Sequence, residues 1–411
     1  MQRQQKRNIM KTKINLLTII LVLILMSNIS NAQNFTIYNT ANSGISDNYV
    51  GDIEIYNGNL WAGTSNGISK FDGSNWTVYN TSNSGLAHNI ITDMSISMTG
   101  EVWVANYDQG VVQFNGTSWT NFNTSNSGLS NNNMVSIKVD NNNIWIGTYG
   151  GLNIYDSTNW TTYNTSNSGI PDDNVRRLDF ESNGDVWVPT WYGGIAKFDG
   201  STWTVFDASN SILPSNSVPI VRIDNQQNKW IGTNNGLVKF DGTNWTLYNT
   251  GNSPLPDDDV RAIEFNNVGD VIIGTNGGGL AIYDGNNWTI YNTSNSLLPS
   301  NEIRSLKFDN NSGNLWIGTN QGLVKMETVI SAVTDYIFPD NILYFPNPSN
   351  GIFTISHANG KTTFYEITDI TGKVIQKGTM TGNQTIIDLS ENGNGVYFLI
   401  TDKQTTKLVK E

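Results

Sequence analysis

A short segment centred on tryptophan recurs seven times along this chain, at intervals of 42 to 44 residues. The central residues of the copies are Trp61, Trp103, Trp145, Trp187, Trp230, Ile272 and Trp316. A fixed period of this length is typical of repeat architectures, whose units bury a hydrophobic face only against a neighbouring unit. The period therefore restricts the chain to a repeat fold before any other feature is considered.

Each repeat has the pattern of four short strands. An apolar strand such as 260–265 precedes the tryptophan strand, and a third strand such as 236–240 follows it. An Asp-Gly pair, as at Asp241 and Gly242, then reverses the chain, which is a strong hairpin signal. The fourth strand reads Asn-Trp-Thr-x-Tyr-Asn-Thr, as at 287–293. Four short strands per repeat predict the blade of a β-propeller.

The third strand explains why the blades must close into a ring. Its first position is aliphatic in all seven copies and its fourth is aromatic in six, as at Leu237 and Phe240. These positions face opposite sides of a strand, so each sheet carries bulky apolar groups on both faces. Every blade then needs two neighbours, which a ring supplies.

The two ends of the repeat region are complementary. The seventh copy ends near Met326 without a fourth strand, while residues 34–40 match residues 287–293 with Phe35 in place of the tryptophan. We therefore predict an all-β fold, a seven-bladed β-propeller over residues 33–328 closed by its N-terminal strand.

The first 32 residues have the pattern of a signal peptide. Five basic residues precede an apolar run over 14–26, and small residues precede Gln33. The run is shorter than a membrane span of about 20 residues, so we expect cleavage and no transmembrane segment in the mature chain. Residues 33–411 contain 18 basic and 35 acidic residues, a balance that argues against nucleic acid as a partner. The chain has no cysteine, which excludes disulfides and thiolate metal sites. We expect no metal and no cofactor.

The segment after the repeats has a different pattern. We expect a linker over 329–341 and a small β-sandwich over 342–411, with strands at 352–356, 364–367 and 395–401. Residues 342–411 resemble the type A C-terminal sorting domain of the type IX secretion system. The resemblance lies in five motifs: 344–351, 369–373, 387–390, 395–398 and 407–411. It implies recognition by the type IX secretion machinery, a secreted or cell-surface location, and no catalytic role for this segment.

The repeats resemble the two-component regulator propeller family. The resemblance rests on the Leu-Trp-Ile-Gly-Thr strand at 315–319, the Gly-Leu pair that follows it, and the inner strand, repeated over 46–326. It implies a ligand-binding propeller of the kind that senses oligosaccharides outside the cell. No membrane helix or kinase-like segment follows the repeats, so we carry over ligand binding and not signalling.

Antiparallel order places the turn between the second and third strands beside the connection to the next blade. At one position of this turn, three adjacent blades carry Tyr107, Tyr149 and Trp191, and Tyr192 follows Trp191; the other blades carry Ser or Asn. Exposed rings of this kind indicate a platform for sugar rings or for a protein partner. Alternatively, the rings fold down over the blade edge as local packing.

The start of the inner strand carries a second set of candidates. Two positions before it, all seven blades have Asn or Asp, as expected of a turn residue that bonds the backbone. The next position varies among the blades. One position after the start lie Arg176, Arg261 and Arg304, and Arg177 follows Arg176. These arginines are suited to an acidic sugar or a phosphate, or they pair with Asp172, Asp257 or Asp259.

Signals for catalysis are weak. The repeats contain one histidine, His88, with no nucleophile motif around it, and Asp52 and Asp93 form a carboxylate pair of a common kind. The sequence therefore favours a non-catalytic binding propeller, with a glycan as the expected ligand. The alternatives are a polysaccharide lyase or hydrolase on the same fold, and a protein-interaction or adhesion module that binds a cell-surface protein.

Overall fold

The computed structural model describes residues 34–140, 143–327, 342–345, 349, 351–357, 363–380, 384–401 and 405–410. The chain divides into two compact units, residues 1–329 and 330–411. The expected signal peptide and linker lie outside the described residues. Within the described ranges, no helix is long and apolar enough to span a membrane.

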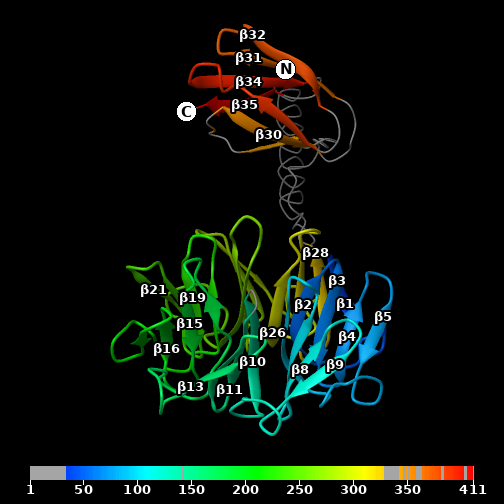
Figure 1. The fold of residues 1–411 in the computed structure, drawn as a ribbon, viewed down its shortest axis with the longest axis vertical. Coiled ribbons are helices and arrows are strands. Elements are labelled where there is room, and N and C mark those ends of the chain that lie inside the picture. Colours follow the sequence, from blue (N-terminus) through cyan, green and yellow to red (C-terminus); the bar gives the residue numbers. More distant parts are fainter. Residues whose placement is uncertain are drawn as a thin grey trace, which may run out of the picture. The chain divides into compact units, whose positions relative to one another are not determined.

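The first unit is a propeller of seven four-stranded antiparallel sheets, which confirms the predicted fold class (Figure 1). Blade 1 comprises β2 (Val50–Tyr56), β3 (Asn59–Thr64), β4 (Gly67–Phe71) and β5 (Trp76–Tyr79). Blade 2 comprises β6 (Ile91–Ile96), β7 (Val102–Asn106), β8 (Gly110–Phe114) and β9 (Trp119–Phe122). Blade 3 comprises β10 (Met134–Asp140), β11 (Asn143–Thr148), β12 (Gly151–Tyr155) and β13 (Trp160–Tyr163). Blade 4 comprises β14 (Asp179–Phe180), β15 (Val186–Pro189), β16 (Ile195–Phe198) and β17 (Trp203–Phe206). Blade 5 comprises β18 (Ile220–Ile223), β19 (Lys229–Thr233), β20 (Gly236–Phe240) and β21 (Trp245–Tyr248). Blade 6 comprises β22 (Val260–Phe265), β23 (Val271–Thr275), β24 (Leu280–Tyr283) and β25 (Trp288–Tyr291).

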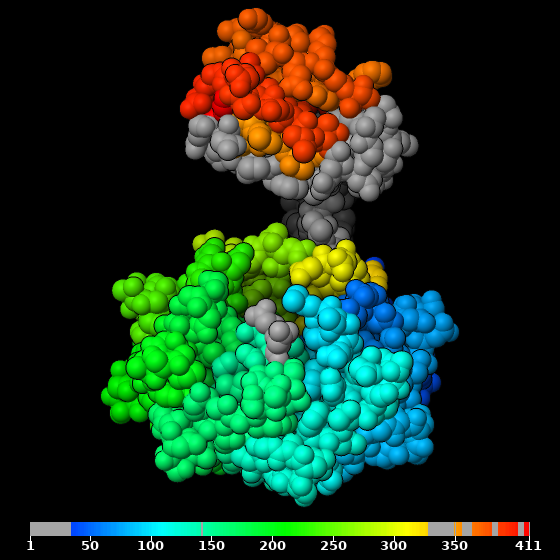
Figure 2. Space-filling view, viewed as in Figure 1, coloured from blue at the N-terminus to red at the C-terminus, as the bar shows by residue number. Residues whose placement is uncertain are grey.

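Blade 7 contains both ends of the propeller, as the sequence predicts. It consists of β26 (Ile303–Phe308), β27 (Asn314–Thr319), β28 (Leu323–Glu327) and, as its outer strand, β1 (Asn34–Tyr38). β1 pairs antiparallel with β28, from Asn34 opposite Glu327 to Tyr38 opposite Leu323. The yellow end of the propeller therefore lies beside its blue start (Figures 1 and 2). The ring is closed by hydrogen bonds between its first and last strands.

Packing between blades follows the two-faced pattern of the third strand. The propeller contains seven hydrophobic clusters, one at each interface between neighbouring blades. The closing cluster joins Trp316 and Leu323 of blade 7 to Val50 and Leu60 of blade 1. Because blades 7 and 1 share a core like all the others, the ring has no open interface.

The loops between blades are held by the predicted Asn and Asp residues. In all seven blades this side chain accepts a hydrogen bond from the backbone N–H eight residues earlier; Asn48, for example, accepts from Thr40 at 2.9 Å. The assignment of this position to structure is confirmed. Beside it, Gly67 has φ 104°, and a Cβ there would lie 2.2 Å from the carbonyl oxygen of Tyr79. The loop thus requires glycine at this turn.

The second unit is a sandwich of two sheets. One sheet has the order β29 (Ile342–Phe345), β30 (Ile352–His357) and β33 (Gln384–Asp388). The other has the order β32 (Val374–Met380), β31 (Thr363–Asp369), β34 (Gly395–Thr401) and β35 (Thr405–Lys410). Phe353 and Ile387 of the first sheet share a buried core with Ile367 and Leu399 of the second. The expected β-sandwich is confirmed.

Candidate functional site

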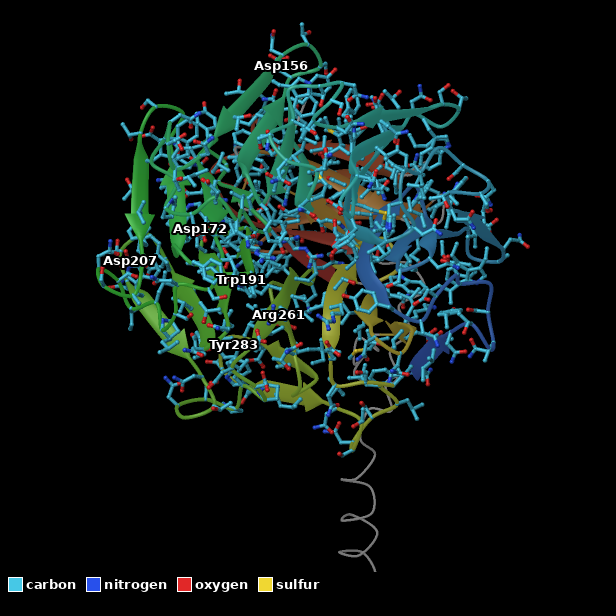
Figure 3. All side chains as sticks on the ribbon, turned by 90° about the horizontal axis from the view of Figure 1, so that it is seen from below. Asp156, Asp172, Trp191, Asp207, Arg261 and Tyr283 are labelled. Atoms are coloured by element: carbon cyan, nitrogen blue, oxygen red, sulfur yellow. The ribbon has the colours of Figure 1, made fainter. Side chains whose placement is uncertain are left out.

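All seven blades contribute to a cavity of about 270 Å³ on the axis of the propeller, which we call the arginine cavity. Its lining includes Tyr49, Tyr107, Tyr149, Trp191, Arg176, Arg177, Arg261 and Arg304. Trp191 and Arg261 lie close together in the inner part of the propeller, whereas Asp156 and Asp207 lie at its periphery (Figure 3). The cavity therefore collects side chains from turns that are far apart in the sequence.

β-Bulges direct the inner-strand candidates into this cavity. In five blades the register with the second strand shifts at the same place, so that Gly51, Thr92, Val135, Arg261 and Arg304 have no direct partner. A bulge bends its strand and re-aims the extra side chain. Blade 4 departs further, because β14 contains only Asp179 and Phe180. Upstream, Arg177 forms a parallel bridge with Ile220 of blade 5.

Trp191 lies between two guanidinium groups. The Arg176 guanidinium is 4.1 Å from the centre of the Trp191 ring, and that of Arg261 is 5.4 Å from it. Arg176 also lies 5.9 Å from the Tyr149 ring. Trp191 is thus engaged in cation–π contacts, while Tyr107 and Tyr149 remain 50% and 52% exposed. Among the predicted aromatic residues that line the cavity, the two tyrosines offer the most accessible surface.

Two of the cavity arginines are paired with acidic residues from the variable position immediately before the inner strand. Arg261 lies 2.6 Å from Asp259, and Arg304 pairs with Glu302. Arg304 also lies 5.4 Å from the ring of Tyr49, which occupies that position in blade 1. Of the three carboxylates expected as partners, Asp172 and Asp257 instead accept backbone N–H bonds in their turns.

Arg177 forms the floor of the arginine cavity. Its Nε donates to Asp93 at 3.0 Å, and its Nη2 donates to the carbonyl oxygen of Gly51 at 3.2 Å. Its Nη1 reaches the carbonyl oxygen of Arg304 at 3.4 Å, so this side chain from blade 4 contacts blades 1, 2 and 7. Burial alone would lower the pKa of Arg177, but the Asp93 and Asp52 carboxylates outweigh it and raise the pKa. Arg177 therefore acts as a cross-link of the ring.

A second cavity of about 250 Å³ lies on the other side of Arg177, the one residue that lines both cavities. We call it the ion-pair cavity, because its walls hold Lys307 with Glu54 at 2.6 Å and Arg222 with Glu264 at 3.2 Å, together with Lys138, which pairs with Asp179 at 2.6 Å. Each pair links neighbouring blades. Burial opposes the ionisation of Asp179, yet Lys138 and Arg222 hold its pKa below the usual value.

Asp52 differs from the other carboxylates of the ion-pair cavity. Its Oδ2 accepts the backbone N–H of Met94 at 2.8 Å, but its Oδ1 lies 3.9 Å from the nearest nitrogen of Arg177. Burial and the neighbouring Asp93 carboxylate raise the pKa of Asp52 to about 8, against the opposing effect of Arg177. Both effects favour the protonated form of Asp52 in the folded protein.

The raised pKa of Asp52 gives a testable pH dependence. The folded chain holds a proton that the unfolded chain loses above about pH 4, so the free energy of unfolding should fall as the pH rises from about 4 to about 8. The slope from this group is at most about 1.4 kcal/mol per pH unit. In Asp52→Asn, which retains the acceptor for Met94, we expect a flatter profile in urea unfolding between pH 5 and pH 8.5. An unchanged slope in the variant would contradict the assignment.

His88 has a structural role in its turn. Its Nδ1 accepts the backbone N–H of Ile90 at 3.0 Å. The same bond is made in the other six blades by Asp47, Asn131, Asp172, Ser215, Asp257 and Ser300. The imidazole lies 5.8 Å from the Tyr107 ring but does not line the arginine cavity. His88 thus replaces a turn acceptor.

The structure brings seven of the eight candidate residues to one cavity. Tyr192 is the exception: it is 71% exposed, and its backbone N–H donates to Asp172 at 2.7 Å, outside the lining. The residues that sequence reasoning missed are Tyr49 and Glu302, which share with Asp259, a partner already expected from the sequence, the position immediately before the inner strand. Its variability among blades, beside an invariant Asn or Asp, was the signal that could have revealed them.

Two family models match the sequence. Residues 343–411 match the secretion system C-terminal sorting domain, and residues 128–150 and 297–321 match the two component regulator propeller. These matches agree with the two resemblances found in the sequence, a sorting domain over residues 342–411 and regulator propeller repeats before it. The sorting domain implies interaction with the secretion machinery, and the protein is secreted or displayed at the outer cell surface. A comparison with curated proteins found no match.

Solved structures share the fold at low identity. The extracellular domain of the hybrid two component system BT3049 from B. thetaiotaomicron has a TM-score of 0.64 at 20% identity over 92% of this chain and 57% of its own. PorZ, a bacterial surface component of the type-IX secretion system of Porphyromonas gingivalis, has a TM-score of 0.60 at 17% identity over 91% and 61%. Virginiamycin B lyase from Staphylococcus aureus has a TM-score of 0.58 at 16% identity over 72% and 98%. The chain thus spans about three fifths of the first two, and at these identities the likeness shows the fold.

Proposed function

We propose that this secreted propeller is a binding protein without catalytic activity and that its ligand is a glycan held in the arginine cavity. The observation that carries the proposal is the pair of half-exposed rings, Tyr107 and Tyr149, on adjacent blades of that cavity. Large rings that keep half of their surface accessible beside polar groups are typical of carbohydrate and protein contact sites. A concave site on a closed scaffold also limits the ordering cost of binding.

The contacts of the acid–base candidates disfavour a lyase or hydrolase. His88 is bonded within its turn, and Asp93 is bonded to Arg177 and to the backbone N–H of Ile137. A protein-interaction or adhesion module on the same face is the second candidate function. It is favoured by Tyr192, whose ring is the most exposed of the four predicted aromatic residues and lies outside the cavity lining.

A glycan array tests the proposed function. Residues 34–411 should give hits, and Tyr107→Ala/Tyr149→Ala should weaken them by about tenfold or more, since each 1.4 kcal/mol of lost contact energy is tenfold in affinity. Tyr192→Ala is the matched control, because it removes a more exposed tyrosine that does not line the cavity. An array without hits, or hits that Tyr192→Ala weakens as strongly as the double variant does, would reject glycan binding in this cavity. Glycan-independent capture by intact cells would then favour adhesion.

A further inference from the structure

The arginine cavity concentrates positive charge in an otherwise acidic chain. This observation restricts the expected glycan to an acidic one, an inference that rests on the proposed function. Beyond residue 32 the sequence contains five arginines, against 35 acidic residues in the whole chain. Four of the five line this one cavity: Arg176, Arg177, Arg261 and Arg304. Since the surface as a whole is acidic, a general need for solubility does not explain this clustering.

Arg176 differs from the other three arginines in its partners. Arg177, Arg261 and Arg304 each pair with a carboxylate. In the described part of the chain, no carboxylate comes within salt-bridge distance of Arg176; its neighbours are Trp191, Tyr149 and the like-charged Arg261. Burial, with a further contribution from Arg261, lowers the pKa of Arg176, although Tyr149 and Asp172 oppose this effect. An anion beside Arg176 would give its buried guanidinium group the close counter-charge that the other three cavity arginines already have.

Nitrogen atoms without a hydrogen-bond partner in the arginine cavity also favour an anionic ligand. The Nε atoms of Arg176, Arg261 and Arg304 are all buried without a hydrogen-bond partner. A buried donor without a partner costs about 1–3 kcal/mol, and this cost recurs at three residues of one cavity. Small rotations of the guanidinium groups toward a shared oxyanion would give these donors partners. Carboxylate and sulfate oxygens suit the planar donor fork of arginine.

The floor of the cavity restricts how a polymer enters. Arg177 spans the axis with bonds to Asp93, Gly51 and Arg304, so the arginine cavity ends at this side chain. Its volume of about 270 Å³ lies just below the range of roughly 300–1,000 Å³ for ligand sites. A cavity that is small and closed at one end accommodates the end of a chain, whereas an open groove would accommodate its middle.

We propose that the arginine cavity binds the terminal acidic sugar of a glycan, with the Arg176 guanidinium on its carboxylate or sulfate group and Tyr107 and Tyr149 against its ring. The anion displaces no salt bridge, because Arg176 is the one cavity arginine without a carboxylate within salt-bridge distance among the described residues. Arg261 and Arg304 keep their acidic partners and supply further donors.

Matched glycan pairs test the role of charge. Residues 34–411 are titrated with a panel of uronic acid oligosaccharides and their neutral methyl esters, and of sulfated oligosaccharides and their desulfated forms. We expect at least one acid to bind tenfold or more tightly than its neutral partner and to lose affinity as salt increases. The preferred arm of the panel distinguishes carboxylate from sulfate. Equal affinity within every bound pair would overturn this inference and leave glycan binding intact, whereas no binding in the panel or on the array would also overturn the proposed function.

Variants at Arg176 test the residue. Arg176→Met retains the length of the stem and should lower affinity for the acid by about tenfold or more without affecting the neutral partner. Arg176→Lys should give an intermediate affinity, since it retains charge but not the donor fork. Lys373→Met changes net charge equally at an exposed site in the second unit and should have no effect. Equal loss in Lys373→Met and Arg176→Met, or no loss in a folded Arg176→Met protein, would overturn the assignment.

The last measurement compares affinities for glycans that carry the acidic sugar at different positions. A trisaccharide with the acidic residue at its end should bind at least tenfold more tightly than an isomer with the same residue in the middle. Equal binding of the two isomers would exclude end recognition.

Discussion

Removal of residues 34–40 is expected to abolish cooperative unfolding of the propeller or to lower its melting temperature by more than about 10 °C. These residues contain β1, which completes blade 7 by pairing with β28. Without β1, the backbone groups of β28 become an exposed strand edge, a site for aggregation. Tyr38 is lost as well, and its ring stacks on Trp316 at 5.8 Å in the core that joins blades 7 and 1. Thermal unfolding followed by circular dichroism measures the effect.

Two controls separate the loss of ring closure from a general defect. Ile37→Asp places a carboxylate against the core between blades 6 and 7 and should cost about 2–4 kcal/mol. Thr36→Asp makes the same change at the exposed neighbouring position and should be nearly neutral. Residues 34–40 attached behind Glu327 through an Asp-Gly turn, as in blades 1, 4, 5 and 6, should restore cooperativity. A truncated chain that melts at the original temperature would contradict closure by β1.

Replacement of Arg177 is expected to have the second largest effect. Arg177→Met removes the cation between Asp93 and three backbone carbonyl groups, and should lower the free energy of unfolding by about 3 kcal/mol at pH 8. The loss should shrink toward pH 5, because Asp93 without its partner is protonated more readily and then no longer leaves a buried charge unpaired. Urea unfolding at the two pH values measures this change.

The partner of Arg177 provides the control. Asp93→Asn in the Arg177→Met background should recover part of the stability at pH 8, because the unpaired buried carboxylate is then absent. Lys377→Met, which removes an exposed cation from a 2.7 Å pair with Glu366 in the second unit, should leave the unfolding of the propeller unchanged. Strictly additive effects of the Arg177 and Asp93 substitutions would show that the 3.0 Å contact does not couple the two residues.

Most of the fold could be predicted from the sequence because the same residue pattern recurs in each blade. Residues 287–293 reappear as residues 34–40, and this match alone predicts the pairing of β1 with β28. The Asn or Asp before each inner strand is equally local, since it bonds the backbone eight residues earlier. Features that recur in every blade and act within one turn are the ones that a sequence reveals.

The centre of the ring was less predictable, because its contacts join residues that no local pattern relates. Arg177 contacts Asp93, 84 positions away, and the carbonyl oxygen of Arg304, 127 positions away. As a result, the cross-link that Arg177 forms was not predicted from the sequence. The pairing of Arg261 with Asp259 was among the open alternatives, whereas the pairing of Arg304 with Glu302 depends on bulges that the sequence does not signal.

Closure by the first strand also constrains the order in which the propeller can fold. Blades 1 to 6 are each built from consecutive residues, but Asn34–Tyr38 can pair only once Leu323–Glu327 is present. A chain interrupted anywhere before residue 327 therefore leaves its leading strand without a partner, however many blades it has formed. Only a chain that includes its last propeller strand can therefore close the ring.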